Sequence, residues 1–155
     1  MKQLKKVVAK ILKYGTLVST LGFIGATGIQ IYARFFMDSA PSWTEEAARF
    51  FFIYAVSFAA GLAMKDGYYV HFDVFYNKMK ERHQIVLKLL VAILTLILFL
   101  FLSAYSIYFV QVGIPEHSPS LNVPMAIAFG SMLLMGLGVS FFAFLNIIKN
   151  YKKLK

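Results

Sequence analysis

Long apolar stretches alternate with short polar connections along this chain. An α-helix needs about 20 mainly apolar residues to cross the hydrocarbon core of a bilayer. The stretches that reach this length are residues 14–36, 44–64, 85–112 and 121–148. We therefore predict an all-α integral membrane protein with four transmembrane helices, which form a single domain over residues 1–155.

The connection between the second and third stretches has a mixed pattern instead of a purely polar one. Val74, Phe75 and Met79 are interspersed with amide and charged side chains over about residues 73–82. A short helix with one apolar and one charged face lies in the plane of the membrane surface. We expect such an interfacial amphipathic helix here.

Polar residues mark the start of the second span. Ser42 follows Pro41, and Glu45 stands three residues later, which is the spacing of a capping box. Trp43 is expected at the headgroup level, where an amphipathic ring is favoured. Arg49 is four residues after Glu45, so the two side chains can form an ion pair on one helical face. The group is either a helix boundary with a weak surface pair or a docking point for another membrane protein.

Arg34, near the end of the first span, has two possible roles. The connection of residues 37–43 is short, so the first two spans form an antiparallel hairpin. Arg34 can pair across this hairpin with Glu45 or Glu46, which is the reading we favour. Otherwise its guanidinium faces a partner protein. In the connection between the third and fourth spans, Ser118 or Asn122 is a candidate cap for the fourth helix.

Small residues recur at intervals of mostly three or four in three of the spans. In lipid, such stripes let helix backbones approach closely and pack. The stripes are Gly15, Ser19, Gly22 and Ala26, then Ala48, Ala55, Ala59 and Ala63, and finally Gly136, Ser140 and Ala143. Together they predict that the helices pack as a bundle.

Composition and charge support this reading. The mean hydropathy is +0.68 and 59% of the 155 residues are hydrophobic, which excludes an ordinary soluble domain. The net charge of +9 does not indicate nucleic acid, because 14 of the 16 basic residues fall before the first span, between the second and third, or after the fourth. The exceptions are Arg34 and Arg49. The positive-inside rule then places both termini in the cytoplasm.

The central parts of the spans contain no Asp, Glu, Lys, Arg or His. A coupling ion or proton is usually held by such groups near the membrane midplane, so the chain alone is a poor candidate for a transporter. The chain has no cysteine, and its three histidines lie outside the spans without metal-ligand spacing. We therefore expect no catalytic residue, cofactor or metal in this chain, and we predict that it is not an enzyme.

These residues resemble the small membrane subunit of TRAP (tripartite ATP-independent periplasmic) transporters, the DctQ-like proteins. The resemblance covers nearly the whole chain. It rests on Arg34, Trp43, Glu45, Glu46, Arg49, Gly61, Lys65, Asp73, Pro119, Leu121 and Pro124.

One position departs from the family pattern. The family often has a histidine four residues before the loop aspartate, but this chain has Tyr69 there and His71 two residues later. A role of that histidine therefore does not transfer to this protein.

The resemblance implies a scaffold in the lipid of the bacterial inner membrane. Its expected partners are a large multi-span membrane subunit, which holds the substrate and sodium sites and moves as an elevator, and a periplasmic binding protein. The expected substrate is an organic acid, such as sialic acid or a C4-dicarboxylate. Two alternatives remain open: an independent homo-oligomeric transporter or channel, and a membrane anchor for an enzyme complex.

Overall fold

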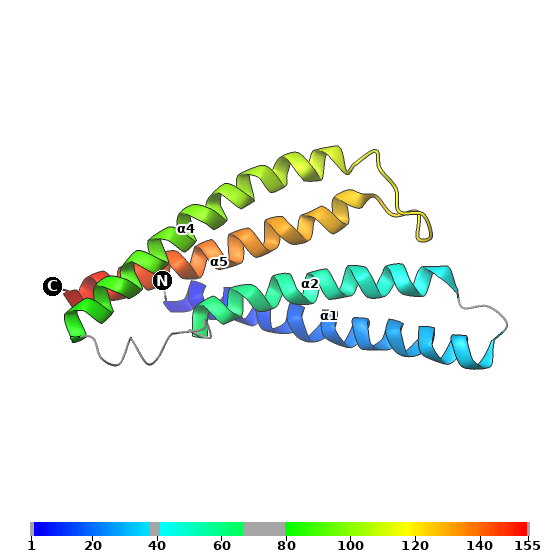
Figure 1. The fold of residues 1–155 in the computed structure, drawn as a ribbon, viewed down its shortest axis with the longest axis horizontal. Helices are drawn as coiled ribbons and strands as arrows, with labels where there is room; N and C mark the ends of the chain where they lie inside the picture. Colours follow the sequence, from blue (N-terminus) through cyan, green and yellow to red (C-terminus); the bar gives the residue numbers. More distant parts are fainter. Residues whose placement is uncertain (1, 38–40, 67–79, 155) are drawn as a thin grey trace.

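The computed structural model describes residues 2–37, 41–66 and 80–154. The helices of these segments are α1 (Lys2–Phe36), α2 (Ser42–Asp66), α4 (Glu81–Val112) and α5 (Met125–Leu154) (Figure 1). Each of them is long and apolar enough to cross a membrane. The described residues form no strand, only one isolated bridge between His117 and Pro124. The prediction of an all-α protein with four membrane-spanning helices is confirmed.

The helix boundaries differ from the predicted ones: α2 is two residues longer at each end, α5 ends six residues later, and three helix starts also differ. α1 begins at Lys2 instead of residue 14, because no Gly or Pro interrupts the lysine-rich segment before the span. At 1.5 Å per residue, α1 is roughly 50 Å long. α4 begins at Glu81, four residues early, and α5 begins at Met125, four residues late.

The predicted interfacial helix falls mainly on residues 67–79, which lie outside the described part of the chain. The remainder of its range is described. Lys80 has an extended backbone, with φ −60° and ψ 144°, and precedes the first turn of α4. Glu81 and Arg82 therefore belong to α4.

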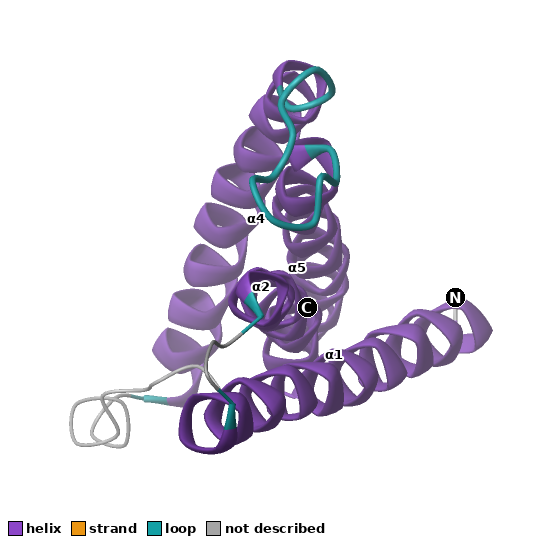
Figure 2. Cartoon of the chain, turned by 90° about the vertical axis from the view of Figure 1, so that its right-hand side faces the viewer, coloured by secondary structure: helices purple, strands orange, loops and turns teal. Residues whose placement is uncertain are grey.

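The helices are arranged in the order α1, α2, α5, α4 across the molecule (Figures 1 and 2). α1 packs on α2 and α4 packs on α5, while α2 and α5 join the two pairs. Both chain ends lie at the same end of the molecule, which we call the terminal end (Figure 1). The opposite end, which carries the connection 113–124, is called the loop end.

The buried core lies where α1, α2 and α5 meet. Leu12, Met64, Val139, Phe142 and Ala143 form one cluster with exposed fractions of at most 6%. Such a cluster from three helices holds α1 as well as α2 onto α5.

Two glycines allow α2 and α5 to approach closely beside this core. A Cβ atom added to Gly61 would lie 3.4 Å from the backbone of Gly138 and 2.7 Å from Leu12 Cδ1. Only glycine therefore fits at Gly61 without movement of the neighbouring leucine. Gly138, which the small-residue stripes did not include, is buried at the same contact.

The other helix pairs also use small residues. On α1, Gly15 and Gly22 face the rings of Phe58 and Phe51 of α2, which would lie 2.6 Å from an added Cβ atom. Between α4 and α5, Gly136 packs against Ser103, and its added Cβ atom would lie 3.2 Å from the Phe99 carbonyl oxygen. Small residues thus make room for phenylalanine rings in the first hairpin and allow close backbone approach in the second.

We predict that Gly136→Ala destabilises the chain by about 1–3 kcal/mol, because the added methyl group overpacks the contact with Ser103. Gly25→Ala is the matched control, since a Cβ atom there meets nothing within 4 Å. It should leave the stability unchanged or raise it by about 0.5–1 kcal/mol, because alanine favours a helix more than glycine does. Unfolding in mixed micelles titrated with a denaturing detergent measures both. Equal losses of unfolding free energy would contradict the packing role of Gly136.

Candidate functional site

Polar side chains gather at the loop end, where the first turns of α2 meet the connection between α4 and α5. Glu45, Glu46, Arg49, Pro119 and Ser120, which we call the loop cluster, line a shallow cavity of 210 Å³ together with Ser42. Residues far apart in the sequence thus meet at one surface.

The start of α2 differs from the predicted capping box. Glu45 binds Arg49 instead of reaching back to the helix start, so this prediction is wrong. Thr44 makes the hydrogen bonds at the helix start instead. Its hydroxyl donates to the Pro41 carbonyl oxygen at 2.7 Å, and its N–H donates to the same oxygen at 3.2 Å. Thr44 is fully buried, whereas Ser42 is exposed.

The predicted ion pair between Glu45 and Arg49 is present, with Glu45 Oε1 2.9 Å from Arg49 Nη2. The two side chains are 65% and 70% exposed, so water screens their attraction. The pair therefore adds little to stability, and both groups are accessible at the surface.

Glu46 makes the structurally important contact of the loop cluster. Its Oε2 accepts hydrogen bonds from the backbone N–H groups of Ser120, at 3.0 Å, and Leu121, at 2.7 Å. Hydrogen bonds to an ionised acceptor are stronger than neutral ones. This carboxylate therefore ties α2 to the connection between α4 and α5.

The predicted pairing of Arg34 with Glu45 or Glu46 is wrong. Both glutamates have other partners, and Arg34 forms no ion pair with any residue that the structure describes. The physical reason is the direction of the side chain. Ala33 is 1% exposed, and Arg34, the next residue around the helix, is exposed in the last turn of α1.

The connection 113–124 closes on itself. The hydroxyl oxygen of Ser118 accepts the Val123 N–H at 3.2 Å, and the Ser118 N–H donates to the Val123 carbonyl oxygen at 2.9 Å. Asn122 adopts a positive φ of 53°, which asparagine tolerates well. Neither residue caps the fourth helix as predicted, because both are used in this turn.

Carbonyl groups of the connection cap α5 instead. The N–H groups of Met125 and Ala126 donate to the carbonyl oxygens of Glu116, at 2.8 Å, and Gly113, at 2.9 Å. Gly113 is required at this position, since a Cβ atom would lie 2.7 Å from the Ala126 nitrogen. The signal for it was present in the sequence, because a glycine directly after a helix commonly ends that helix.

Two further hydrogen bonds join α2 and α5. The Tyr54 hydroxyl donates to the Ile127 carbonyl oxygen at 2.7 Å, and the Asn146 amide donates to the Met64 carbonyl oxygen at 3.1 Å. Sequence reasoning did not single out either residue for this role. A tyrosine or asparagine within an apolar span is a usable signal, because its polar group needs a partner in lipid.

The remaining predicted residues lie as follows. Trp43 is exposed in the first turn of α2, and Gly61 lies in the contact of α2 with α5 described above. Ala55 and Ala59 are half-buried, whereas Ser19 and Ser140 are buried. The Ser140 hydroxyl oxygen has no hydrogen-bond partner among the described residues. No group of three or more potential metal ligands occurs in the parts of the chain that the structure covers.

The fold and the site define a class of protein: a multi-pass membrane protein in which long-range polar contacts join helices and a loop. Comparison with known families is more specific. Residues 23–153 match the family model described as "Tripartite ATP-independent periplasmic transporters, DctQ component", so the chain belongs to this family.

One curated relative agrees with this assignment. It is a protein of Haemophilus influenzae named "Putative TRAP transporter small permease protein", 20% identical over 151 residues. The match covers 97% of this chain and 92% of the relative. The chain is therefore a small membrane component of a transporter and not an enzyme, and it belongs in the bacterial inner membrane. This role implies a large membrane subunit and a binding protein as partners.

We predict that Glu46→Ala loosens the connection 113–124, because the Ser120 and Leu121 N–H groups lose their acceptor. The stability should fall by about 1–3 kcal/mol. Hydrogen exchange of peptides covering the connection should become faster. Glu46→Gln should have a smaller effect, because its amide oxygen still accepts a hydrogen bond.

Glu45→Ala is the matched control for this experiment. It removes the same charge one residue away, but only from an exposed ion pair worth about 1 kcal/mol or less. If Glu45→Ala and Glu46→Ala speed exchange equally, the link between α2 and the connection does not hold the loop.

Proposed function

We propose that this chain is the scaffold subunit of a sodium-driven TRAP transporter. It packs against the large membrane subunit, which carries the substrate and the sodium ions and moves as an elevator. A periplasmic binding protein delivers the substrate, an organic acid such as sialic acid or a C4-dicarboxylate. Both termini of the scaffold are cytoplasmic, and the loop cluster is periplasmic.

The observation that carries this proposal is the lack of ionisable groups in the central parts of the spans. A site for sodium or for an organic acid near the midplane requires charged side chains or freed backbone oxygens. In the described helices, three of the hydroxyl groups within the spans are used locally. Ser57, Ser103 and Ser106 each donate to the carbonyl oxygen four residues earlier at 2.7 Å.

The arrangement of the helices supports a scaffold. α1 and α4 occupy the two outer positions, so each can be covered from outside by another protein (Figure 1). Large apolar side chains such as Leu94, Phe101 and Tyr108 are more than half exposed on α4. In the assembled transporter, these surfaces face either lipid or the large subunit.

Reconstitution into liposomes tests the proposal. We expect that the chain alone accumulates neither labelled sialic acid nor labelled succinate under a sodium gradient. The complete set of chain, large subunit and binding protein should accumulate the physiological organic acid, and omission of the chain should abolish uptake. Accumulation by the chain alone would identify it as an independent transporter. Full uptake without the chain would contradict the scaffold role.

The orientation can be tested separately, because the chain contains no cysteine. Ser120→Cys places a thiol at the loop end and Lys152→Cys places one at the terminal end. A membrane-impermeant maleimide applied to intact spheroplasts should label only Ser120→Cys, and lysis should make Lys152→Cys reactive. The reverse pattern would show that the termini are periplasmic.

A further inference from the structure

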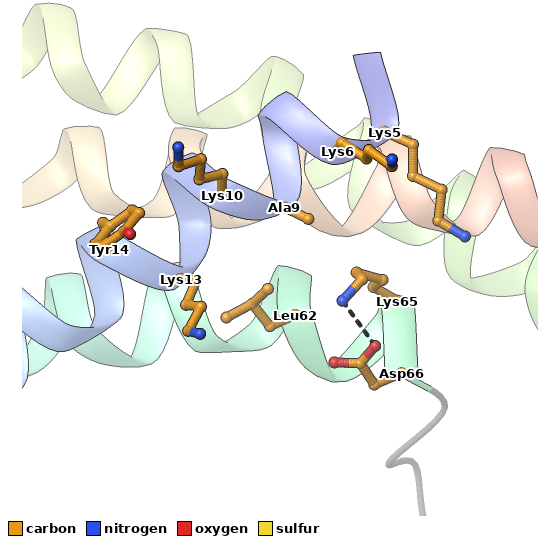
Figure 3. Close-up of a pocket in the computed structure, with 9 residues that line it drawn as sticks. All are labelled: Lys5, Lys6, Ala9, Lys10, Lys13, Tyr14, Leu62, Lys65 and Asp66. Atoms are coloured by element: carbon orange, nitrogen blue, oxygen red, sulfur yellow. Dashed lines mark ion pairs between the residues drawn. The ribbon is translucent and has the colours of Figure 1, made fainter. Parts of the chain in front are cut away.

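A groove opens at the terminal end, between the first turns of α1 and the last turn of α2 (Figure 3). It has a volume of 890 Å³. Lys5, Lys6, Lys10 and Lys13 of α1 and Lys65 of α2 line it. The early start of α1 creates this surface, because the lysines are carried on a regular helix instead of an irregular leader.

The groove has an unbalanced positive charge. Among the described residues that line it, the single carboxylate belongs to Asp66, which lies 2.9 Å from Lys65 Nζ. The four α1 lysines form no ion pair with any described residue. Lys13 and Lys65 extend into the space between the helices on either side of Leu62 (Figure 3). Several cationic groups that line one groove favour an anion between them.

The groove is also apolar in part, and an apolar surface continues from it. Ala9 and Leu62 line it between the lysines. From Tyr14, which borders the groove, exposed apolar side chains continue along one face of α1 as Leu17, Leu21 and Ile24. These residues are three or four apart, so they form a stripe along the helix. A ligand that fits both parts has an anionic head and long apolar chains.

The size of the basic part indicates more than one phosphate. Lys5 and Lys13 are eight residues apart on α1, which is roughly 12 Å along the helix axis. A headgroup with two phosphates matches the length of such a row better than a single phosphate does. Basic pockets between transmembrane helices are known to suit the headgroups of anionic lipids.

We propose that this groove is a binding site for an anionic phospholipid of the surrounding membrane. The lysines bind the headgroup phosphates, and the acyl chains lie along the stripe that begins at Tyr14. Diphosphatidylglycerol, with two phosphates, binds more tightly than phosphatidylglycerol, with one. The bound lipid then bridges the first turns of α1 to the end of α2.

Variants with equal loss of charge test the proposal. The groove variant is Lys6→Gln, Lys10→Gln and Lys13→Gln. The matched control is Lys149→Gln, Lys152→Gln and Lys153→Gln, since these lysines lie at the end of α5 and do not line the groove. Native mass spectrometry of the full chain with its large subunit, titrated with diphosphatidylglycerol, phosphatidylglycerol or phosphatidylethanolamine, measures lipid retention.

We expect the groove variant to bind diphosphatidylglycerol at least roughly tenfold more weakly, because each lysine near the headgroups contributes to attraction. The control variant should stay within about twofold of the natural chain. A variant with arginine at the three groove positions should retain binding. Equal losses in the groove and control variants would overturn the proposal, because they would show attraction by general surface charge. Tight binding of inorganic pyrophosphate without lipid would also overturn it, in favour of a soluble phosphate compound.

A second measurement uses the unaltered chain and so does not depend on the folding of variants. Lysines are acetylated with a limiting reagent in micelles with and without diphosphatidylglycerol, and the modified positions are quantified by mass spectrometry. The lipid should protect Lys6, Lys10 and Lys13 several-fold more than Lys149, Lys152 and Lys153. Equal protection of the two groups would refute a site in the groove.

Discussion

The close contact of α2 with α5 holds the two helical hairpins together. In lipid, apolar side chains gain little by leaving their surroundings, so helices associate through close packing and polar contacts. Gly61 and Gly138 permit the packing, and Leu12 of α1 fills the space beside them. Tyr54 and Asn146 add hydrogen bonds between α2 and α5, and Glu46 adds hydrogen bonds from α2 to the connection before α5. Loss of this contact would leave two separate hairpins.

Features that depend on nearby residues could be predicted from the sequence. The four spans follow from local hydropathy, and the Glu45–Arg49 pair follows from a spacing of four on one helix. The contact of Glu46 with Ser120 and Leu121 could not be predicted in this way. It joins positions that are 74 and 75 residues apart. The donors are backbone N–H groups, which nearly every residue has, so the identities of Ser120 and Leu121 do not indicate the contact.

The errors have a common physical origin. Glu45 and Ser118 each had a plausible local partner, but a competing one was better placed: Arg49 one helical turn away, and Val123 across a turn.

Gly138 was missed because it falls two residues from Gly136, outside a spacing of three or four. The structure uses both, with Gly136 facing α4 and Gly138 facing α2. A helix between two neighbours needs small residues on two faces, and a single stripe describes only one of them.

The two ends of the molecule differ in how their charges are used. At the loop end, Glu46 accepts hydrogen bonds from two backbone N–H groups and Glu45 pairs with Arg49, so two of its acidic groups have partners within the protein. At the terminal end, Asp66 is the one carboxylate among the described residues that line the groove with the five lysines. Excess positive charge at one end resists transfer across the membrane during insertion. The same charges need counterions after insertion, and the headgroups of anionic lipids are the nearest source. Lipid bound at such an end would hold the helices at a defined depth in the membrane, which agrees with the scaffold role proposed above.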